Sequence, residues 1–198
     1  MNEMRTQAIA MADSMCEMLE SIGKGFMEHK DEFLADAIKK ENQINEMEKA
    51  ATARVLELSK ALKDDTERKE LIALQQVVQT LERMGDEAAS LVERIEIKNA
   101  EHLLFSDLGV AQYNETFGTM RKSVEMMREF LKGKDGVLRE RIIDNGFQVK
   151  ALVERFRAEH ADRLLRGICT PMAANMFFDM LDFTGNLARH SSSIVKLL

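Results

Sequence analysis

The feature that most constrains this chain is an apolar spacing of alternating three and four residues, kept from Leu74 to Ile95 and again from Val110 to Leu131. Such spacing is typical of one side of a long α-helix that packs against other helices. The chain has a single proline in 198 residues, so little interrupts these helices. We predict an all-α protein of long, nearly antiparallel helices, whose packing seams are Leu74, Val77, Leu81, Met84, Ala88, Leu91 and Ile95 in one segment, and Val110, Tyr113, Phe117, Met120, Val124, Met127 and Leu131 in the next.

Breaker and cap signals divide the chain into six long segments. Thr170 followed by Pro171 is the clearest, because threonine is a good N-cap and proline fits the first helical position. Asp64 with Glu67 three residues on has the spacing of a capping box. The other breaks are expected between Gly23 and Asp31, at Ser106 or Asp107, and in the stretch KGKDGV.

An internal repeat is visible when the chain is shifted by 100 residues. TLERMGDEAASL then lies on MLDFTGNLARHS, and Leu81, Gly85 and Ala88 match Leu181, Gly185 and Ala188. Repeats of this kind indicate a duplicated structural unit. We predict two tandem three-helix bundles, residues 1–105 and 106–198, with Gly85 and Gly185 as architectural residues.

Acidic residues accompany the seams of the first unit. Glu82 and Asp86 are four residues apart, so their carboxylates share one helix face, which points away from the seam. Glu41 and Glu48 lie within an apolar stripe that runs from Leu34 to Leu62. A buried carboxylate needs a base, a proton or a metal ion as its partner. Either such a partner is present, or the stripe is shifted by one residue and the acids face water.

A cation is one such partner. The carboxylates of Glu41, Glu48, Glu82 and Asp86, with the Asn45 amide, offer oxygen ligands for Mg, Mn or iron, with Zn a further option. In the second unit, Gly146 and Val153 stand at the positions that match Glu41 and Glu48. Asp182 and Asn186 stand at the positions that match Glu82 and Asp86. No histidine follows a glutamate at the Glu-x-x-His spacing of ferritin-like sites. We therefore expect all four histidines at the surface or at helix ends, with His190, beside Asn186, as the one of interest.

Composition argues against several other functions. The net charge of −6 carries no basic block for nucleic acid, and Cys16 and Cys169 form no CxxC motif. The chain shows no signal peptide and no run of about 18 to 20 apolar residues that would insert into a membrane. It also lacks a Gly-rich phosphate loop and a GxSxG motif. These observations favour a protein of the cytoplasm, and they do not support an enzyme.

Two stretches resemble a known family. TLERMGDEAASLVERI is similar to the signature helix of PhoU proteins, which reads approximately Leu-Glu-Arg-Ile-Gly-Asp before a small and apolar run. The stretch KKENQINEMEKAATARVLELSKAL resembles the helix that precedes the signature helix in PhoU proteins. With the two-unit layout, the resemblance spans most of the chain.

The resemblance implies a non-enzymatic regulator of phosphate uptake and signalling. Its partners would be a phosphate transporter and a sensor kinase at the inner face of the membrane, and a homodimer is an open alternative. Some family members bind metal clusters at a Glu/Asp-x-x-x-Asp motif. In this chain the motif acids are Glu82 and Asp86, the neighbouring polar positions are Glu41, Asn45 and Glu48, and Asp182 is all that the second copy keeps.

Two alternatives remain open at this point. PhoU-like units also form the cytoplasmic part of sodium/phosphate cotransporters, in which case the membrane part would be the partner. The chain would instead be a plain helical interaction domain without metal if the acids are only a solvated face.

Overall fold

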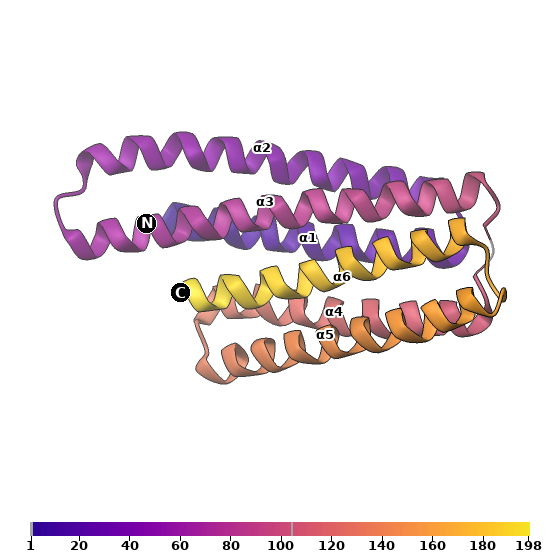
Figure 1. The fold of residues 1–198 in the computed structure, drawn as a ribbon. Coiled ribbons are helices and arrows are strands. Elements are labelled where there is room, and N and C mark those ends of the chain that lie inside the picture. The colour runs from indigo at the N-terminus through magenta and orange to yellow at the C-terminus, as the bar shows by residue number, and fades with distance from the viewer. Residues whose placement is uncertain (1, 104) are drawn as a thin grey trace.

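The computed structural model describes residues 2–103 and 105–198, which form six α-helices (Figure 1). The described residues contain no strand, so the predicted all-α fold is confirmed. Residues 1 and 104, which belong to the first predicted unit, lie outside the described part. The helices are α1 (Asn2–Glu28), α2 (Asp31–Ala61), α3 (Asp65–Ala100), α4 (Asp107–Gly133), α5 (Gly136–Leu165) and α6 (Pro171–Leu197).

The predicted caps begin three of these helices. The Asp64 carboxylate accepts a hydrogen bond from the Glu67 amide at 3.1 Å, and the Ser106 hydroxyl accepts one from the Gly109 amide at 3.2 Å. Thr170 caps α6, with Pro171 at its first position. Each cap satisfies a backbone N–H that has no partner within its helix.

The first break is shorter than the sequence suggested. We expected an interruption from Gly23 to Asp31, but α1 continues through Gly23 and Gly25 to Glu28. The turn is instead made at His29, whose φ of 54° is left-handed. Gly25 permits close packing, because a Cβ there would lie 2.4 Å from Leu34 Cδ2 of α2.

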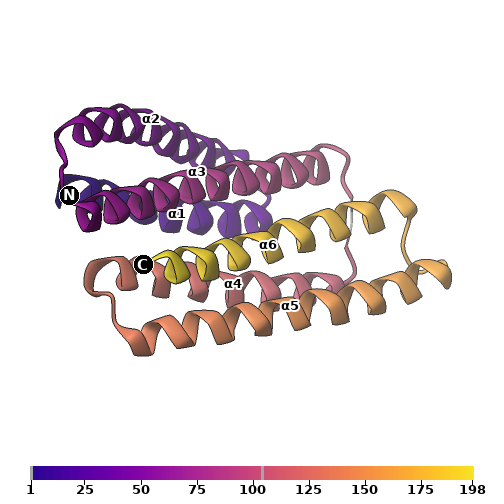
Figure 2. The ribbon, with the colours of Figure 1, turned by 60° about the vertical axis from the view of Figure 1, so that its left-hand side comes forward.

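The six helices form two three-helix bundles, as predicted, and these share one core. α1, α2 and α3 contact one another, and α4, α5 and α6 do the same, while α3 packs on α6 and α1 packs on α4 (Figures 1 and 2). Within the described residues, α2 and α5 contact only helices of their own bundle. Neither these helices nor the others described are long and apolar enough to span a membrane.

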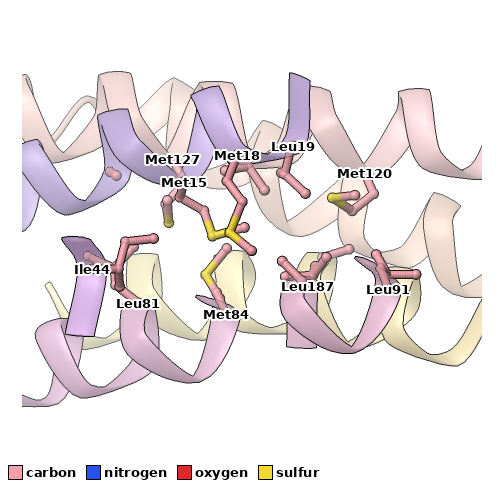
Figure 3. Packing of buried hydrophobic residues seen from close by; sticks show 14 of the residues in the cluster. Met15, Met18, Leu19, Ile44, Leu81, Met84, Leu91, Met120, Met127 and Leu187 are labelled. Carbon is pink, nitrogen blue, oxygen red and sulfur yellow. The ribbon is translucent and has the colours of Figure 1, made fainter. Parts of the chain in front are cut away.

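The shared core is rich in methionine. Figure 3 shows Met15, Met18 and Met84 of the first bundle beside Met120, Met127 and Leu187 of the second. All six side chains are completely buried. Methionine is unbranched and flexible, so it fills the irregular space where four helices meet.

Candidate functional site

We predicted that both acids of the α3 motif point away from the seam, and they lie outside its buried residues to different degrees. Leu81 and Met84 are completely buried, whereas Glu82 is half-buried and Asp86 is exposed. Gly85, between the two acids, is buried against α2, where a Cβ would lie 3.5 Å from Ile44 Cγ2. That distance is ordinary van der Waals contact, so the packing here does not require glycine.

The neighbouring helix α2 places its acids on the flank of its apolar stripe. Its fully buried residues recur every seven positions or fewer, and Glu41 and Glu48 are only half-buried beside them. Asn45 Nδ2 donates a hydrogen bond to Glu41, and the Thr52 hydroxyl donates one to Glu48 Oε1 at 2.7 Å. The two glutamates are therefore only partly buried, and neighbouring polar side chains donate hydrogen bonds to their carboxylates.

Negative charge accumulates between α2 and α3. Burial raises the pKa of the Glu82 carboxyl, and the carboxylates of Asp86 and Glu48 raise it further, against a smaller opposing effect of Arg83. Asn45 Oδ1 is buried and has no hydrogen-bond partner among the described residues. The face thus combines mutually repelling carboxylates with an unsatisfied amide oxygen.

The oxygen atoms of this face are of the kind that a hard cation binds, but their present arrangement does not form a binding site. Carboxylate and amide oxygens are the ligands that Mg, Mn and iron take. In residues 2–103 and 105–198, however, no three His, Cys, Asp or Glu side chains gather closely enough to hold an ion. Metal binding by this face therefore stays a prediction.

The second bundle does not repeat the acidic face. The Asp182 carboxylate forms an ion pair with Arg157, and Asn186 Nδ2 donates to Glu87 Oε1 of α3 at 3.0 Å. Gly146 and Val153 instead line an open groove of about 540 Å³ between α5 and α6. The cationic side chains of this groove are Lys150, Arg189 and Lys196.

His190 lies closer to Asp86 than the sequence could show. Both residues line a hollow of about 370 Å³ between α3 and α6, together with Arg83 and Arg189. Burial lowers the pKa of the His190 imidazole, and the charges of Arg189 and Arg83 lower it further. The shift favours the neutral imidazole, and the two guanidinium charges oppose the binding of a proton or a metal cation there.

Three buried basic side chains were missed by our sequence reasoning. His160 is 3% exposed, so the prediction that it lies at the surface or at a helix end is wrong. Lys98 and Arg163 are also buried. The signal was available, because Lys98 continues the three-and-four spacing beyond Ile95, and His160 and Arg163 continue it beyond Phe156.

Comparison with known protein families finds a match within the first three-helix bundle. The family model of the PhoU domain matches residues 8–95. Most of the first three-helix bundle is thus similar to a PhoU domain. The match covers most of α1 to α3, and the predicted resemblance to PhoU is confirmed there. All the candidate ligands of the first bundle lie within the matched residues.

Solved PhoU structures extend the likeness in fold to both bundles. PhoU from Pseudomonas aeruginosa superposes with a TM-score of 0.91 at 16% identity, over 99% of this chain and 93% of that one. The phosphate transport system regulatory protein PhoU from Streptococcus pneumoniae gives 0.87 at 14%, over 99% and 91%. No curated protein sequence matches the chain. At these identities, the likeness establishes a PhoU-like fold for the chain as a whole.

Proposed function

We propose that the protein regulates phosphate uptake and phosphate signalling by contact with other proteins, without catalysing a reaction. The observation that carries this proposal is the match of the PhoU domain model to residues 8–95. The PhoU-like fold of the second bundle supports it, since one similar structure is that of a phosphate transport system regulatory protein. A shared fold does not by itself define a function, so deletion of the gene is the test of this proposal.

The partners that we propose are a phosphate transporter and a sensor kinase, at the cytoplasmic face of the membrane. Two surfaces of opposite character support two different contacts. One is the acidic face of α2 and α3, and the other is the groove of α5 and α6 with its cationic side chains. Opposite charge patterns favour different partners, because like charges across an interface repel.

The test is deletion of the gene in the source organism, with a reporter of the phosphate-starvation response. We expect the reporter to become active in phosphate-rich medium, and the wild-type gene supplied in trans should silence it again. A reporter and a phosphate uptake rate that both stay unchanged would refute the proposal. The gene's full reading frame would show whether the chain acts as a diffusible protein or within a cotransporter.

A second proposal is that the acidic face of α2 and α3 binds a divalent or trivalent metal ion. Burial is the main cause of the raised pKa of Glu82, and the further rise caused by the carboxylates of Asp86 and Glu48 favours the proposal, because a cation would offset their repulsion. Binding would require at least three of these side chains to move closer together, since no such group is close enough in the described arrangement. A cation would then offset the repulsion.

Metal content separates this proposal from a merely solvated acidic face. Protein purified without chelator is compared with its Glu82→Gln and Asp86→Asn variants by elemental analysis. We expect both variants to lose bound metal, whereas Asp182→Asn should keep it because Arg157 already holds that carboxylate. Equal metal content in the wild type and in both α3 variants would end the proposal.

A further inference from the structure

Buried basic side chains gather at one end of the molecule. This is the end where α1 turns into α2, α3 leads to α4, and α5 turns into α6, at the right in Figure 1. Two hollows of about 320 and 260 Å³ open there and share His102 and Leu103. We call this end the cationic pole, after Arg163, which lines the larger hollow, and Lys98, which lines the smaller one.

Arg163 is a buried guanidinium whose charge has no counterpart. It is 9% exposed, and its Nη2 donates to Gln112 Oε1 at 2.7 Å and to His160 Nδ1 at 2.8 Å. Its Nε is buried without a hydrogen-bond partner among the described residues. Gln112 is neutral, and the nearest acid in this chain of contacts, Glu159, is reached only through Gln112.

His160 does not supply the missing negative charge either. Because Arg163 can only donate, His160 Nδ1 is the acceptor, and the ring proton lies on Nε2, 3.7 Å from Cys169 Sγ. Burial, with Arg163 beside it, lowers the pKa of the imidazole to about 4. The ring is therefore neutral at pH 7 and stacks on Phe177.

Lys98 adds a second buried cation from the adjoining hollow. It is 5% exposed, and its Nζ lies 3.2 Å from His29 Nδ1 and above the rings of Phe26 and Phe105. No carboxylate of the described residues lies within ion-pair distance of Lys98 or Arg163. Buried charges without a counter-ion are costly and rare.

Two helix N-termini point to the same ligand chemistry. Ser106 and Thr170, the caps of α4 and α6, both line the hollow of Arg163. A helix N-terminus carries partial positive charge and favours bound anions. The hollow therefore receives positive potential from a buried guanidinium and from two helix dipoles, although Asp107 in the first turn of α4 offsets part of that helix's contribution.

We propose that the cationic pole binds a phosphate-sized oxyanion in the hollow between Arg163 and the N-termini of α4 and α6. Nη2 of Arg163 already donates to Gln112 and His160, so the guanidinium would hold such an anion through its charge and its remaining N–H groups. Lys98 strengthens the field from the adjoining hollow. The ligand is inorganic phosphate or the phosphate end of a small monoester. Its meaning as a phosphate signal rests on the proposed function, whereas the binding itself rests on this geometry alone.

The test is a titration of the whole protein with sodium phosphate, followed by ¹H–¹⁵N NMR at constant ionic strength set with chloride. We expect saturable shifts of the Arg163 Nε–H signal and of the Leu103 and Thr170 amides. Arg163→Met should weaken binding at least about tenfold, the usual effect of losing a charge-assisted hydrogen bond. Arg139→Met is the matched control, since it removes the same charge near the other end of α5 and should bind as the wild type does.

A second ligand and a second variant make the outcome decisive. Tighter binding of glycerol phosphate than of inorganic phosphate would identify a monoester as the ligand, and the reverse order would identify the free ion. If Arg163→Met does not fold, Lys98→Met provides the test, with weaker binding expected. The inference is overturned if neither ligand gives saturable shifts up to about 10 mM, or if binding survives in the folded variants. A deletion strain without phenotype would refute the proposed function and leave this binding untouched.

Discussion

Replacing Gly25 or Gly85 with alanine should change stability in opposite directions. Alanine at either site gains about 1 kcal/mol in helix propensity, most fully at Gly85, which lies inside α3. At Gly85 the new Cβ would lie 3.5 Å from Ile44 Cγ2, an ordinary contact. We therefore expect Gly85→Ala to stabilise the protein by about 0.5 to 1 kcal/mol. The ordinary contact distance at Gly85 does not support our interpretation of Gly85 as an architectural residue.

At Gly25 the same methyl group meets the side chain of Leu34. The Cβ would lie 2.4 Å from Leu34 Cδ2 and 2.9 Å from its Cγ, so the leucine must move within a packed core. Overpacking of this kind costs about 1 to 3 kcal/mol, which exceeds the gain in propensity. Gly25→Ala should therefore destabilise the protein by about 1 kcal/mol or more.

Urea unfolding followed by circular dichroism measures both effects. Thermal unfolding of the same variants should shift the midpoint temperature by about 2 to 4 °C per kcal/mol for a chain of this size, upward for Gly85→Ala and downward for Gly25→Ala. The double variant should be near the sum of the two. Destabilisation by Gly85→Ala as large as that by Gly25→Ala would show that Cβ distances do not govern the packing of α2.

Further predictions concern Met84 in the core and two titratable groups, the His160 imidazole and the Cys16 thiol. Met84→Ala should lose about 2 to 5 kcal/mol of unfolding free energy, and Met84→Leu less than about 1.5, in the same urea assay. His160, with a folded pKa of about 4 against about 6.5 unfolded, binds its proton more readily in the unfolded chain, so stability should be full above about pH 6.5 and fall toward pH 4. His160→Gln should reduce this loss, as urea midpoints at several pH values would show. Burial raises the pKa of the Cys16 thiol to about 11, so Cys16 should react with a thiol reagent at pH 8 about 100-fold more slowly than an unperturbed cysteine, measured in a Cys169→Ser variant.

The helical architecture follows from seams that the sequence displays openly. All seven predicted seam residues of α3 are buried, and in α4 only Val110, at the start, is partly exposed. The seam of α2 was less predictable. This helix contacts only α1 and α3, so its buried stripe is narrow and the acids at Glu41 and Glu48 lie on its flank.

The site was less predictable than the fold because its chemistry depends on helices distant in sequence. Spacing placed Glu82 and Asp86 on one face, but the proximity of His190 to Asp86 arises from the packing of α3 on α6. The cationic pole depends likewise on contacts such as that between Arg163 and Gln112, which are 51 residues apart. No periodicity within a single helix reports which polar residues will face one another across a bundle.

The packing of α3 on α6 and of α1 on α4 has the form of a dimer interface enclosed within one chain. Its apolar side chains, among them Met84, Met120 and Leu187, are buried only because both halves are present. A chain cut between Ala100 and Asp107 would yield two fragments, each with an uncovered apolar face. The two fragments would bury these faces by associating with each other. The covalent link therefore holds the second half at high effective concentration beside the first.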